Sequence, residues 1–228
     1  MKVSKLLTTA AAAIFILGSC SKTGTDGTTT TPVSMQFQLT TSNPFVVVNK
    51  PAAAGSIAWT SGSAYATEVK LEAKQNGSQL EFKTSTAQQI NLFASVISGL
   101  GNIVIPPGTY TEVKYKISLN QNASTPGLEL NGQYTNAAGT VTPVVFDINS
   151  LFVIKAEQNN VVVGANTSIT ALTTLDLSFV SSGITQTLMN SATITGGKIV
   201  ISASSNINLY NIIVNNLLQF HHVDVTHH

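Results

Sequence analysis

Residues 65–83 of this 228-residue chain read YATEVKLEAKQNGSQLEFK, and they carry the clearest structural signal in the sequence. From residue 65 to 74, one set of side chains alternates with a second set that is charged from Glu68 onward, which is the period of a strand with one buried face. Asn76-Gly77 is the residue pair preferred in two-residue hairpin turns, and the alternation resumes beyond it. The stretch therefore predicts a β-hairpin, with these residues of its first strand facing inward: Tyr65, Thr67, Val69, Leu71 and Ala73.

The same alternation continues in both directions from this hairpin. Strand-like segments recur about every 8–14 residues, with Gly, Pro, Asn or Ser turn signals between them. In the strand that starts at Thr109, the apolar face changes parity between Tyr110 and Val113, which predicts a bulge or twist. Asn159-Asn160 reads as a turn. The pattern predicts an all-β fold, a two-sheet β-sandwich over 34–205, with strands near 35–39, 45–48, 57–59, 65–74, 80–83, 109–119, 128–134, 141–148, 152–156, 161–163, 169–179 and 199–203.

Three segments have helical rather than strand spacing. Residues 88–100 carry an apolar stripe that predicts a short helix or a turn-rich crossover, and 183–192 fits a helical turn. Apolar residues in 206–220 follow helical spacing, with Asn206 as the expected N-cap. The domain 206–228 is therefore expected to be a C-terminal helix with a His-containing tail. The helix closes one end of the sandwich in one interpretation; in the other it is a partner surface, or a strand donated to a neighbouring subunit.

The N-terminus reads as an export signal. Lys2 and Lys5 precede an apolar run over 6–17 that is too short to span a bilayer as a helix. Leu17-Gly18-Ser19-Cys20 resembles the lipobox of bacterial lipoproteins. That resemblance implies a signal peptide over 1–19, cleavage after Ser19 and lipidation of Cys20. The alternative role for Cys20 is a small buried residue. As the only cysteine it has no partner for a disulfide within the chain.

Residues 20–33 read as a lipidated, flexible tether, because they lack the apolar side chains that offset the entropy cost of ordering. The residue after Cys20 is Ser21 rather than Asp. By resemblance to lipoprotein sorting in Gram-negative cells, this favours the outer membrane. Whether the protein faces the periplasm or the cell surface stays open, because the tether holds one acidic residue where surface-export signals carry a cluster.

A second resemblance lies in the middle of the chain. Ile-Asn-Leu at 90–92 is followed by Pro106-Pro107-Gly108-Thr109-Tyr110-Thr111-Glu112-Val113-Lys114, a Pro-x-Gly-x-Tyr-x-x-Val-Lys motif leading into a strand. Residues 35–180 thereby resemble an uncharacterised β-sandwich domain of bacterial lipoproteins. The resemblance implies a prealbumin- or immunoglobulin-like sandwich on a lipid anchor, and it brings no catalytic motif.

Composition argues against several classes of function. The chain is 43% hydrophobic and only 9% charged, against about 25% charged in typical soluble domains. All 11 basic residues are Lys, and removal of the signal leaves nine of them against 10 acidic residues. Nucleic acid is not an expected partner, because binding to phosphate backbones needs a basic patch. No cofactor is expected either.

Two candidate sites follow from single residue types. His221, His222, Asp224, His227 and His228 are close enough in sequence to bind a divalent metal; the alternative is a frayed polar terminus. Trp59, beside a Gly/Ser turn, is the candidate exposed aromatic for sugar binding, whereas Tyr65, Tyr110 and Tyr115 are expected to fill the core.

Catalysis has little support in the sequence. All four His lie in the last eight residues, which excludes a His-based triad or a His-ligated zinc within 34–205. The acidic residues mostly alternate with apolar ones as solvated strand faces, and Asp147 and Asp176 alone read as partly buried. We therefore expect a lipid-anchored envelope protein that acts as a non-catalytic binding or accessory module on a protein or glycan partner. The alternatives are a fimbria- or pilus-like structural subunit and a glycan-binding surface lipoprotein.

Overall fold

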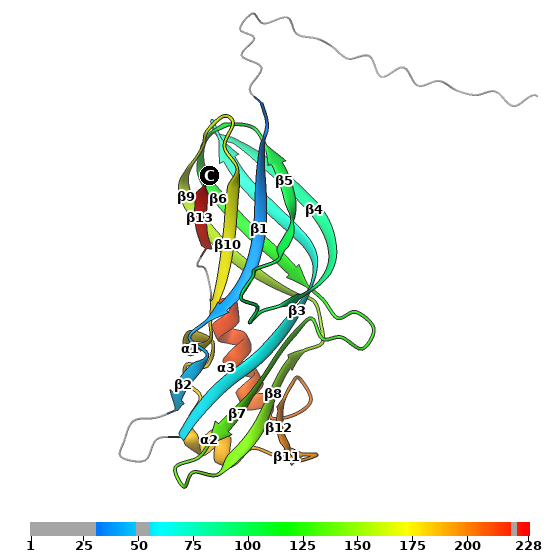
Figure 1. Ribbon diagram of the computed structural model, residues 1–228, viewed down its shortest axis with the longest axis vertical. Coiled ribbons are helices and arrows are strands. Elements are labelled where there is room, and N and C mark those ends of the chain that lie inside the picture. Colours follow the sequence, from blue (N-terminus) through cyan, green and yellow to red (C-terminus); the bar gives the residue numbers. More distant parts are fainter. Residues whose placement is uncertain (1–30, 49–54, 220–222) are drawn as a thin grey trace, which may run out of the picture.

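The fold is built around one long strand, β3 (Gly55–Gln75), which runs along much of the long axis of the molecule (Figure 1). The computed structural model describes residues 31–48, 55–219 and 223–228. The first part of β3 pairs with β2 and β7, and its second part pairs with β4 and β6. These strands belong to a nine-stranded sheet, ordered β11-β12-β8-β7-β3-β6-β9 with β2 and β4 also paired to β3. The other members are β2 (Phe45–Val48), β4 (Ser78–Asn91), β6 (Gly108–Leu119), β7 (Leu128–Thr135), β8 (Val141–Ile148), β9 (Phe152–Val163), β11 (Ile194–Thr195) and β12 (Lys198–Ile201).

A second, four-stranded sheet covers the upper half of the first. Its order is β13-β10-β1-β5, and the neighbours β1 and β10 run parallel. The rings of Phe37 on β1 and Tyr115 on β6 lie with their centroids 6.2 Å apart, which joins the two sheets through the core. The strands of this sheet are β1 (Val33–Ser42), β5 (Gly99–Ile105), β10 (Ile169–Asp176) and β13 (Val223–His227).

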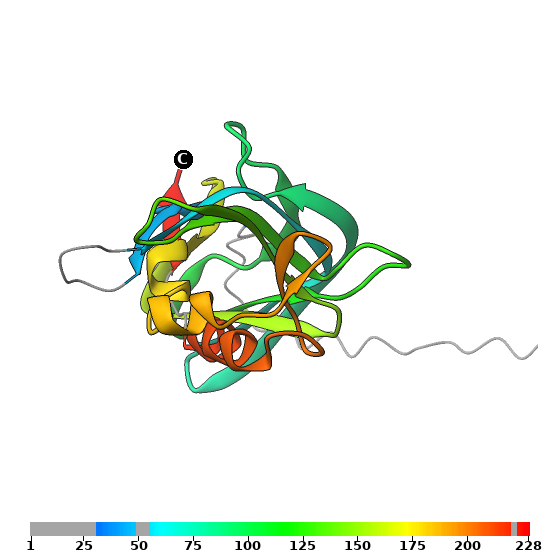
Figure 2. The same cartoon turned by 90° about the horizontal axis from the view of Figure 1, so that it is seen from below.

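Helices take the place of the second sheet in the lower half (Figures 1 and 2). The helix α3 buries Leu209, Ile213 and Leu217, and Tyr210 lies against Phe146 of β8 with ring centroids 5.9 Å apart. The chain is therefore all-β with two sheets, but only its upper half is sheet on sheet. The helices in the described part of the chain are α1 (Leu177–Val180), α2 (Gln186–Asn190) and α3 (Ile207–Leu218).

The inward-facing set of β3 changes twice along the strand. Its pairing shifts register between Trp59 and Ser61 and again between Ala66 and Glu68, so each extra residue moves the buried positions to the other parity. The expected inward positions of Tyr65 and Thr67 are therefore wrong, because both lie on the outward face. The hairpin itself is confirmed: Asn76 and Gly77 both have positive φ, 50° and 79°, as a two-residue turn of this kind requires. Buried on β3 are Ile57, Trp59, Ala64, Ala66, Val69, Leu71 and Ala73.

The parity change between Tyr110 and Val113 is confirmed, since both are buried although they are three positions apart. Its partner strand changes parity at the same level, where Asn160 has a positive φ of 57°. The expected turn at Asn159-Asn160 is wrong, because β9 continues through both residues. Asn tolerates this backbone geometry better than most residues, so it twists the strand without ending it.

The helical segments agree with expectation in part. The helices α2 and α3 lie where 183–192 and 206–220 predict them. The stripe in 88–100 forms no helix; β4 runs to Asn91, and a turn leads into β5 at Gly99. The expected strand over 169–179 ends at Asp176, whose carboxylate accepts hydrogen bonds from the backbone of Ser178 and Phe179 and caps α1. A good N-cap overrides the alternation there.

The C-terminal tail is part of the body. The strand β13 pairs antiparallel with β10, and His228 and Ser168 exchange two backbone hydrogen bonds of 2.9 and 3.2 Å. At the other end, β1 begins at Val33, which is buried although it lies within the segment expected to be tether.

Candidate functional site

A polar groove crosses the outward face of the large sheet at mid-molecule, and we call it the β3 groove. It has a volume of about 410 Å³, within the range of small-molecule sites. Strands β4, β3 and β7 lie side by side there and supply the residues that line it: Ser61, Gly62, Ser63, Gln89, Ile90, Asn91, Glu129 and Asn131.

The first register shift of β3 makes this groove. It turns Ser61 and Ser63 outward and Gly62 inward, where a Cβ on Gly62 would come within 2.7 Å of Leu130 Cδ2. Only a glycine lets β7 approach so closely. The carbonyl of Gly62 accepts a 2.9 Å hydrogen bond from the backbone N–H of Leu92, which holds the end of β4 against β3. The groove thus rests on paired strands rather than on a loop.

The polar side chains of the groove stand in cross-strand rows. Asn91, Ser63 and Glu129 are direct neighbours across β4, β3 and β7, and Ser61 pairs with Asn131 next to them. Asn131 Nδ2 donates a 2.7 Å hydrogen bond to Glu129 Oε1. Asn91 Oδ1 accepts a 3.0 Å hydrogen bond from the backbone N–H of Phe93. These bonds fix the orientation of two amides and one carboxylate at the groove.

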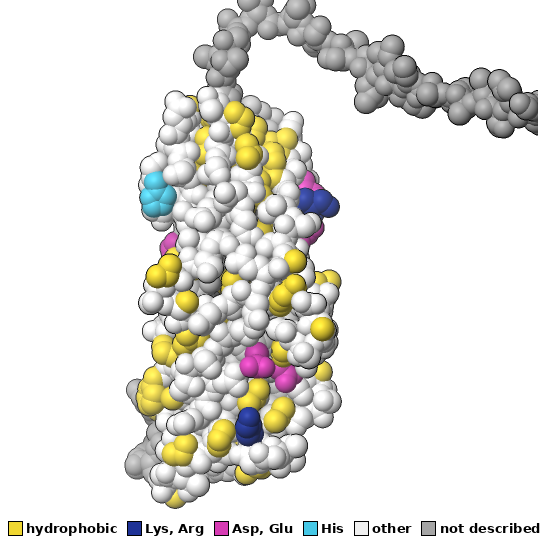
Figure 3. Space-filling model, turned by 45° about the vertical axis from the view of Figure 1, so that its right-hand side comes forward, with side chains coloured by type: hydrophobic (Ala, Val, Ile, Leu, Met, Phe, Trp, Pro, Cys, Tyr) yellow, Lys and Arg dark blue, Asp and Glu magenta, His cyan; other side chains and the backbone are white. Residues whose placement is uncertain are grey.

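The row continues onto β8 with a second carboxylate, because Glu129 pairs with Asp147 in the register of β7 and β8. Burial raises the pKa of Asp147, the negative charge of Glu129 raises it further, and a hydrogen bond from Asn149 acts in the opposite direction. Figure 3 shows acidic side chains close together in the lower half of a surface that is otherwise largely uncharged. The sequence pattern does not show that Asp147 and Glu129 meet, because they become neighbours only through strand register.

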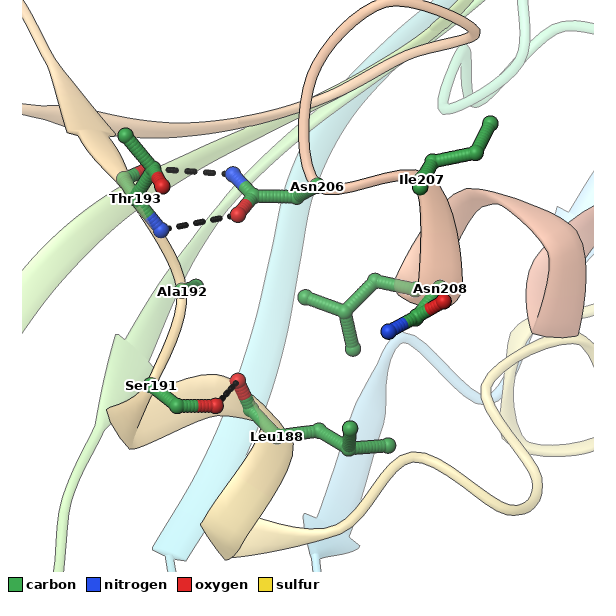
Figure 4. A pocket seen from close by; sticks show the side chains of 8 residues that line it. Leu188, Ser191, Ala192, Thr193, Asn206, Ile207 and Asn208 are labelled. Carbon is green, nitrogen blue, oxygen red and sulfur yellow. Dashed lines mark hydrogen bonds between the residues drawn. The ribbon is translucent and has the colours of Figure 1, made fainter.

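A smaller pocket of about 240 Å³ lies between α2 and the start of α3 (Figure 4). Asn206 occupies the N-cap position of α3, as expected, and its backbone carbonyl accepts a 3.1 Å hydrogen bond from the N–H of Tyr210. It adopts the left-handed conformation, however, and its side chain makes no capping hydrogen bond to the helix. The side-chain amide of Asn206 instead makes two hydrogen bonds to the backbone of Thr193. Its Nδ2 donates to the Thr193 carbonyl at 3.0 Å, and its Oδ1 accepts from the Thr193 N–H at 2.8 Å. Ser191 Oγ donates to the Leu188 carbonyl at 3.1 Å. These polar groups already bond to protein, which makes this pocket the weaker candidate.

Trp59 is not at an exposed site. Its side chain is 3% exposed, and its indole Nε1 donates a 3.0 Å hydrogen bond to Ser181 Oγ in the interior. The expectation of an exposed platform is wrong because Trp59 precedes the first register shift, on the parity that faces the core. Of the three tyrosines expected in the core, Tyr110 and Tyr115 are buried there, whereas Tyr65 is half-buried on the outward face beside the β3 groove.

The other predicted site residues are divided between described and undescribed parts of the chain. Leu17, Gly18, Ser19, Cys20, His221 and His222 lie outside the described residues. Asp224 and His227 are both on β13, but three positions apart, so their side chains point to opposite faces of the strand. Among the residues that the structure describes, no three His, Cys, Asp or Glu side chains form a group that could hold a metal ion.

No helix within 31–48, 55–219 or 223–228 has the length and apolar character to cross a membrane. Comparison of the chain with protein-family models, with curated proteins and with solved structures found no match. The candidate site therefore rests on its own geometry, which supplies hydrogen-bonding groups at fixed positions around an open groove.

Proposed function

We propose that this protein is a lipid-anchored, non-catalytic binding module of the Gram-negative envelope, and that the β3 groove is its ligand site. The observation that carries the proposal is the convergence of six hydrogen-bonding side chains from three paired strands on one groove. Polar groups held on strands keep their geometry when a ligand binds, which lowers the entropy cost of binding.

The proposed location in the cell envelope rests on the sequence. A positive n-region, a short apolar run and Leu17-Gly18-Ser19-Cys20 support export and lipidation at Cys20. Strand β1 begins 13 residues after Cys20, at the upper end of the body in Figure 1. A segment of that length reaches at most about 45 Å when fully extended. The groove lies at mid-molecule, so an anchored protein has room to present it to a ligand.

The facing sheets of the upper half support the finer proposal of a prealbumin- or immunoglobulin-like sandwich for that half. The position of helix α3 argues against the alternative in which this segment is donated to a neighbouring subunit of a fimbria or pilus. Its buried residues Leu209, Ile213 and Leu217 pack into the core of the same chain. This arrangement favours a self-contained module over a subunit that donates the segment to a neighbour.

Two measurements test the proposal. Cys20→Ala should leave the circular dichroism of the protein unchanged and move it from the membrane fraction to the soluble fraction. Stable anchoring by lipid needs more than one acyl chain, and Cys20 is the lipidation site that the lipobox resemblance implies. Its replacement should therefore release the protein almost completely. Membrane retention of Cys20→Ala equal to that of the unaltered chain would refute the anchor.

The binding role is tested separately by NMR chemical-shift mapping. The full chain is titrated with neutral oligosaccharides, uronic-acid oligomers and short peptides, and Ser63→Trp serves as a variant with a filled groove. A binding module requires that at least one class shifts the amides of Ser63 and Asn131, and that Ser63→Trp abolishes the shifts. Absence of groove shifts with every class would refute the binding role.

A further inference from the structure

We infer that the β3 groove recognises a neutral, hydroxyl-rich carbohydrate. The inference rests on the proposed function and names the ligand class for the same groove. Three features of the groove support it: the chemistry of its polar groups, the sign of its charge and a tyrosine at its rim.

The polar groups match sugar hydroxyls. A hydroxyl group both donates and accepts, and it is best bound by side chains that offer both functions close together. The groove presents two serine hydroxyls, three planar amides and one carboxylate. Asn91 Oδ1 accepts from the Phe93 N–H and Glu129 Oε1 accepts from Asn131, which leaves Asn91 Nδ2 as a donor and Glu129 Oε2 as an acceptor for a ligand. A run of adjacent hydroxyls on a sugar ring satisfies such a mixed set.

The charge of the groove argues against anionic and cationic ligands. Its lining holds no Lys, and the carboxylates of Glu129 and Asp147 repel phosphate, sulfate and carboxylate groups. A cation cannot accept the hydrogen bonds that the amide N–H and serine O–H groups of the lining offer, so it would leave those donors unpaired. A neutral ligand that both donates and accepts hydrogen bonds is not repelled by the carboxylates and can pair with the donors of the groove.

Tyr65 supplies an apolar surface beside these polar groups. The register shift turns it outward on the same face as Ser61 and Ser63, and it is the direct cross-strand neighbour of Gln89. An aromatic ring with a polar tip suits a sugar, whose ring has an apolar C–H face and a polar rim.

The test is isothermal titration of the full chain, kept in a detergent without a sugar headgroup, with neutral oligosaccharides of several linkages. We expect binding that weakens about tenfold or more in Asn131→Ala, because the variant loses a hydrogen-bonding amide of the groove and the bond that orients Glu129. Tyr65→Leu should weaken binding several-fold, whereas Tyr65→Phe keeps the ring and should bind almost normally. Asn159→Ala, an exposed amide on β9 outside the groove, is the matched control and should leave affinity unchanged.

The outcomes distinguish failure of the carbohydrate inference from failure of the proposed binding role. Binding of neutral sugars with this mutational pattern supports the inference. Groove binding of peptides alone overturns the carbohydrate class, and groove binding of uronic acids alone overturns the neutral charge of the ligand; both results leave the binding module standing. Sugar binding that persists in Ser63→Trp overturns the placement in the groove, and no binding by any class overturns both. Because Cys20→Ala fractionation is measured independently, the anchor is judged separately.

Discussion

The indole Nε1 of Trp59 donates a 3.0 Å hydrogen bond to the Oγ of Ser181, 122 residues further along the chain. Trp59 lies on β3, and Ser181 is the C-cap residue of the short helix α1. Both residues are buried, so neither polar group has access to bulk water. The bond ties the long strand to the helices that cover the lower half of the sheet.

Trp59→Phe should therefore destabilise the fold by about 1–3 kcal/mol, because it leaves the Ser181 hydroxyl buried without its partner. Ser181→Ala should have an effect of the same sign. Urea unfolding of both variants and of the double variant measures the coupling between the two residues, which we expect to be about 1 kcal/mol. Strictly additive single effects would show that the bond contributes nothing.

Tyr110→Phe should cost about 1 kcal/mol, the net value of a typical hydrogen bond. The Tyr110 hydroxyl donates at 2.6 Å to the carbonyl of Pro106, four residues back at the turn into β6. This bond gives the Pro-x-Gly-x-Tyr motif a structural role. The free energy of unfolding in urea is the measurement, and an unchanged value would contradict that role.

The glycine of the motif yields its own prediction. Gly108 has a φ of 151°, a backbone conformation that costs other residues about 1–3 kcal/mol. Gly108→Ala should lower the thermal midpoint measurably. Gly164→Ala is the matched control, because Gly164 has no positive φ and its nearest neighbour would be the Thr167 side chain at 3.3 Å. Equal losses in the two variants would argue against backbone strain at Gly108.

Tyr115→Phe should not lower the free energy of unfolding as Tyr110→Phe does, although both tyrosines are buried on the same strand. The Tyr115 hydroxyl has no hydrogen-bond partner within the described part of the chain, and burial raises the pKa of its phenol. Removing an unpaired buried hydroxyl should be neutral or stabilise by about 1 kcal/mol. A loss of stability in urea unfolding as large as that of Tyr110→Phe would mean that the hydroxyl is paired.

Glu112 makes stability depend on acid pH. Hydrogen bonds from Lys114 and then from Lys74 lower its pKa to about 2 from an ordinary 4.5. A lowered pKa in the folded state stabilises above the unfolded value, and that contribution is lost as pH falls from 4.5 towards 2. Glu112→Gln should therefore flatten the decline of the unfolding free energy over this range.

The control for that experiment is Glu157→Gln, which removes only a 4.0 Å ion pair with Lys114. High salt should reduce the difference between the unaltered chain and Glu112→Gln, because these charges are accessible to solvent. The same slope in the unaltered chain and in Glu112→Gln would show that the Lys74–Glu112–Lys114 cluster has no part in acid stability.

The outward face around Glu112 shows how register extends a local pattern. Alternation alone places Lys70 and Glu72 on the polar side of their strand. The pairing of four strands then aligns Lys83, Lys70, Lys116 and Lys155 in one row. Glu72 lies beside this row, and hydrogen bonds from Lys116 and then Lys70 lower its pKa. The sequence predicts solvated charges but not which charges meet.

The candidate site was beyond prediction for a similar reason. Ser61, Ser63, Asn91, Glu129 and Asn131 come from three strands, and the register shift of β3 between Trp59 and Ser61 sets which of their positions become neighbours. That shift also turns Trp59 into the core and Tyr65 out of it. Alternation in the sequence does not show where a strand contains an extra residue. The sequence therefore predicts an exposed Trp59 and a buried Tyr65, the reverse of what the structure shows.

By itself, the sequence determined the strand-rich fold, the Asn76-Gly77 hairpin and the C-terminal helix, because each depends on spacing between residues close in the chain. Only the tertiary structure decided which face of β3 is buried after each bulge, that Val223–His227 joins a sheet, and that Glu129 stands beside Asp147. Those outcomes are set by the pairing and packing of distant segments, where burial of one face selects the register and the local pattern does not.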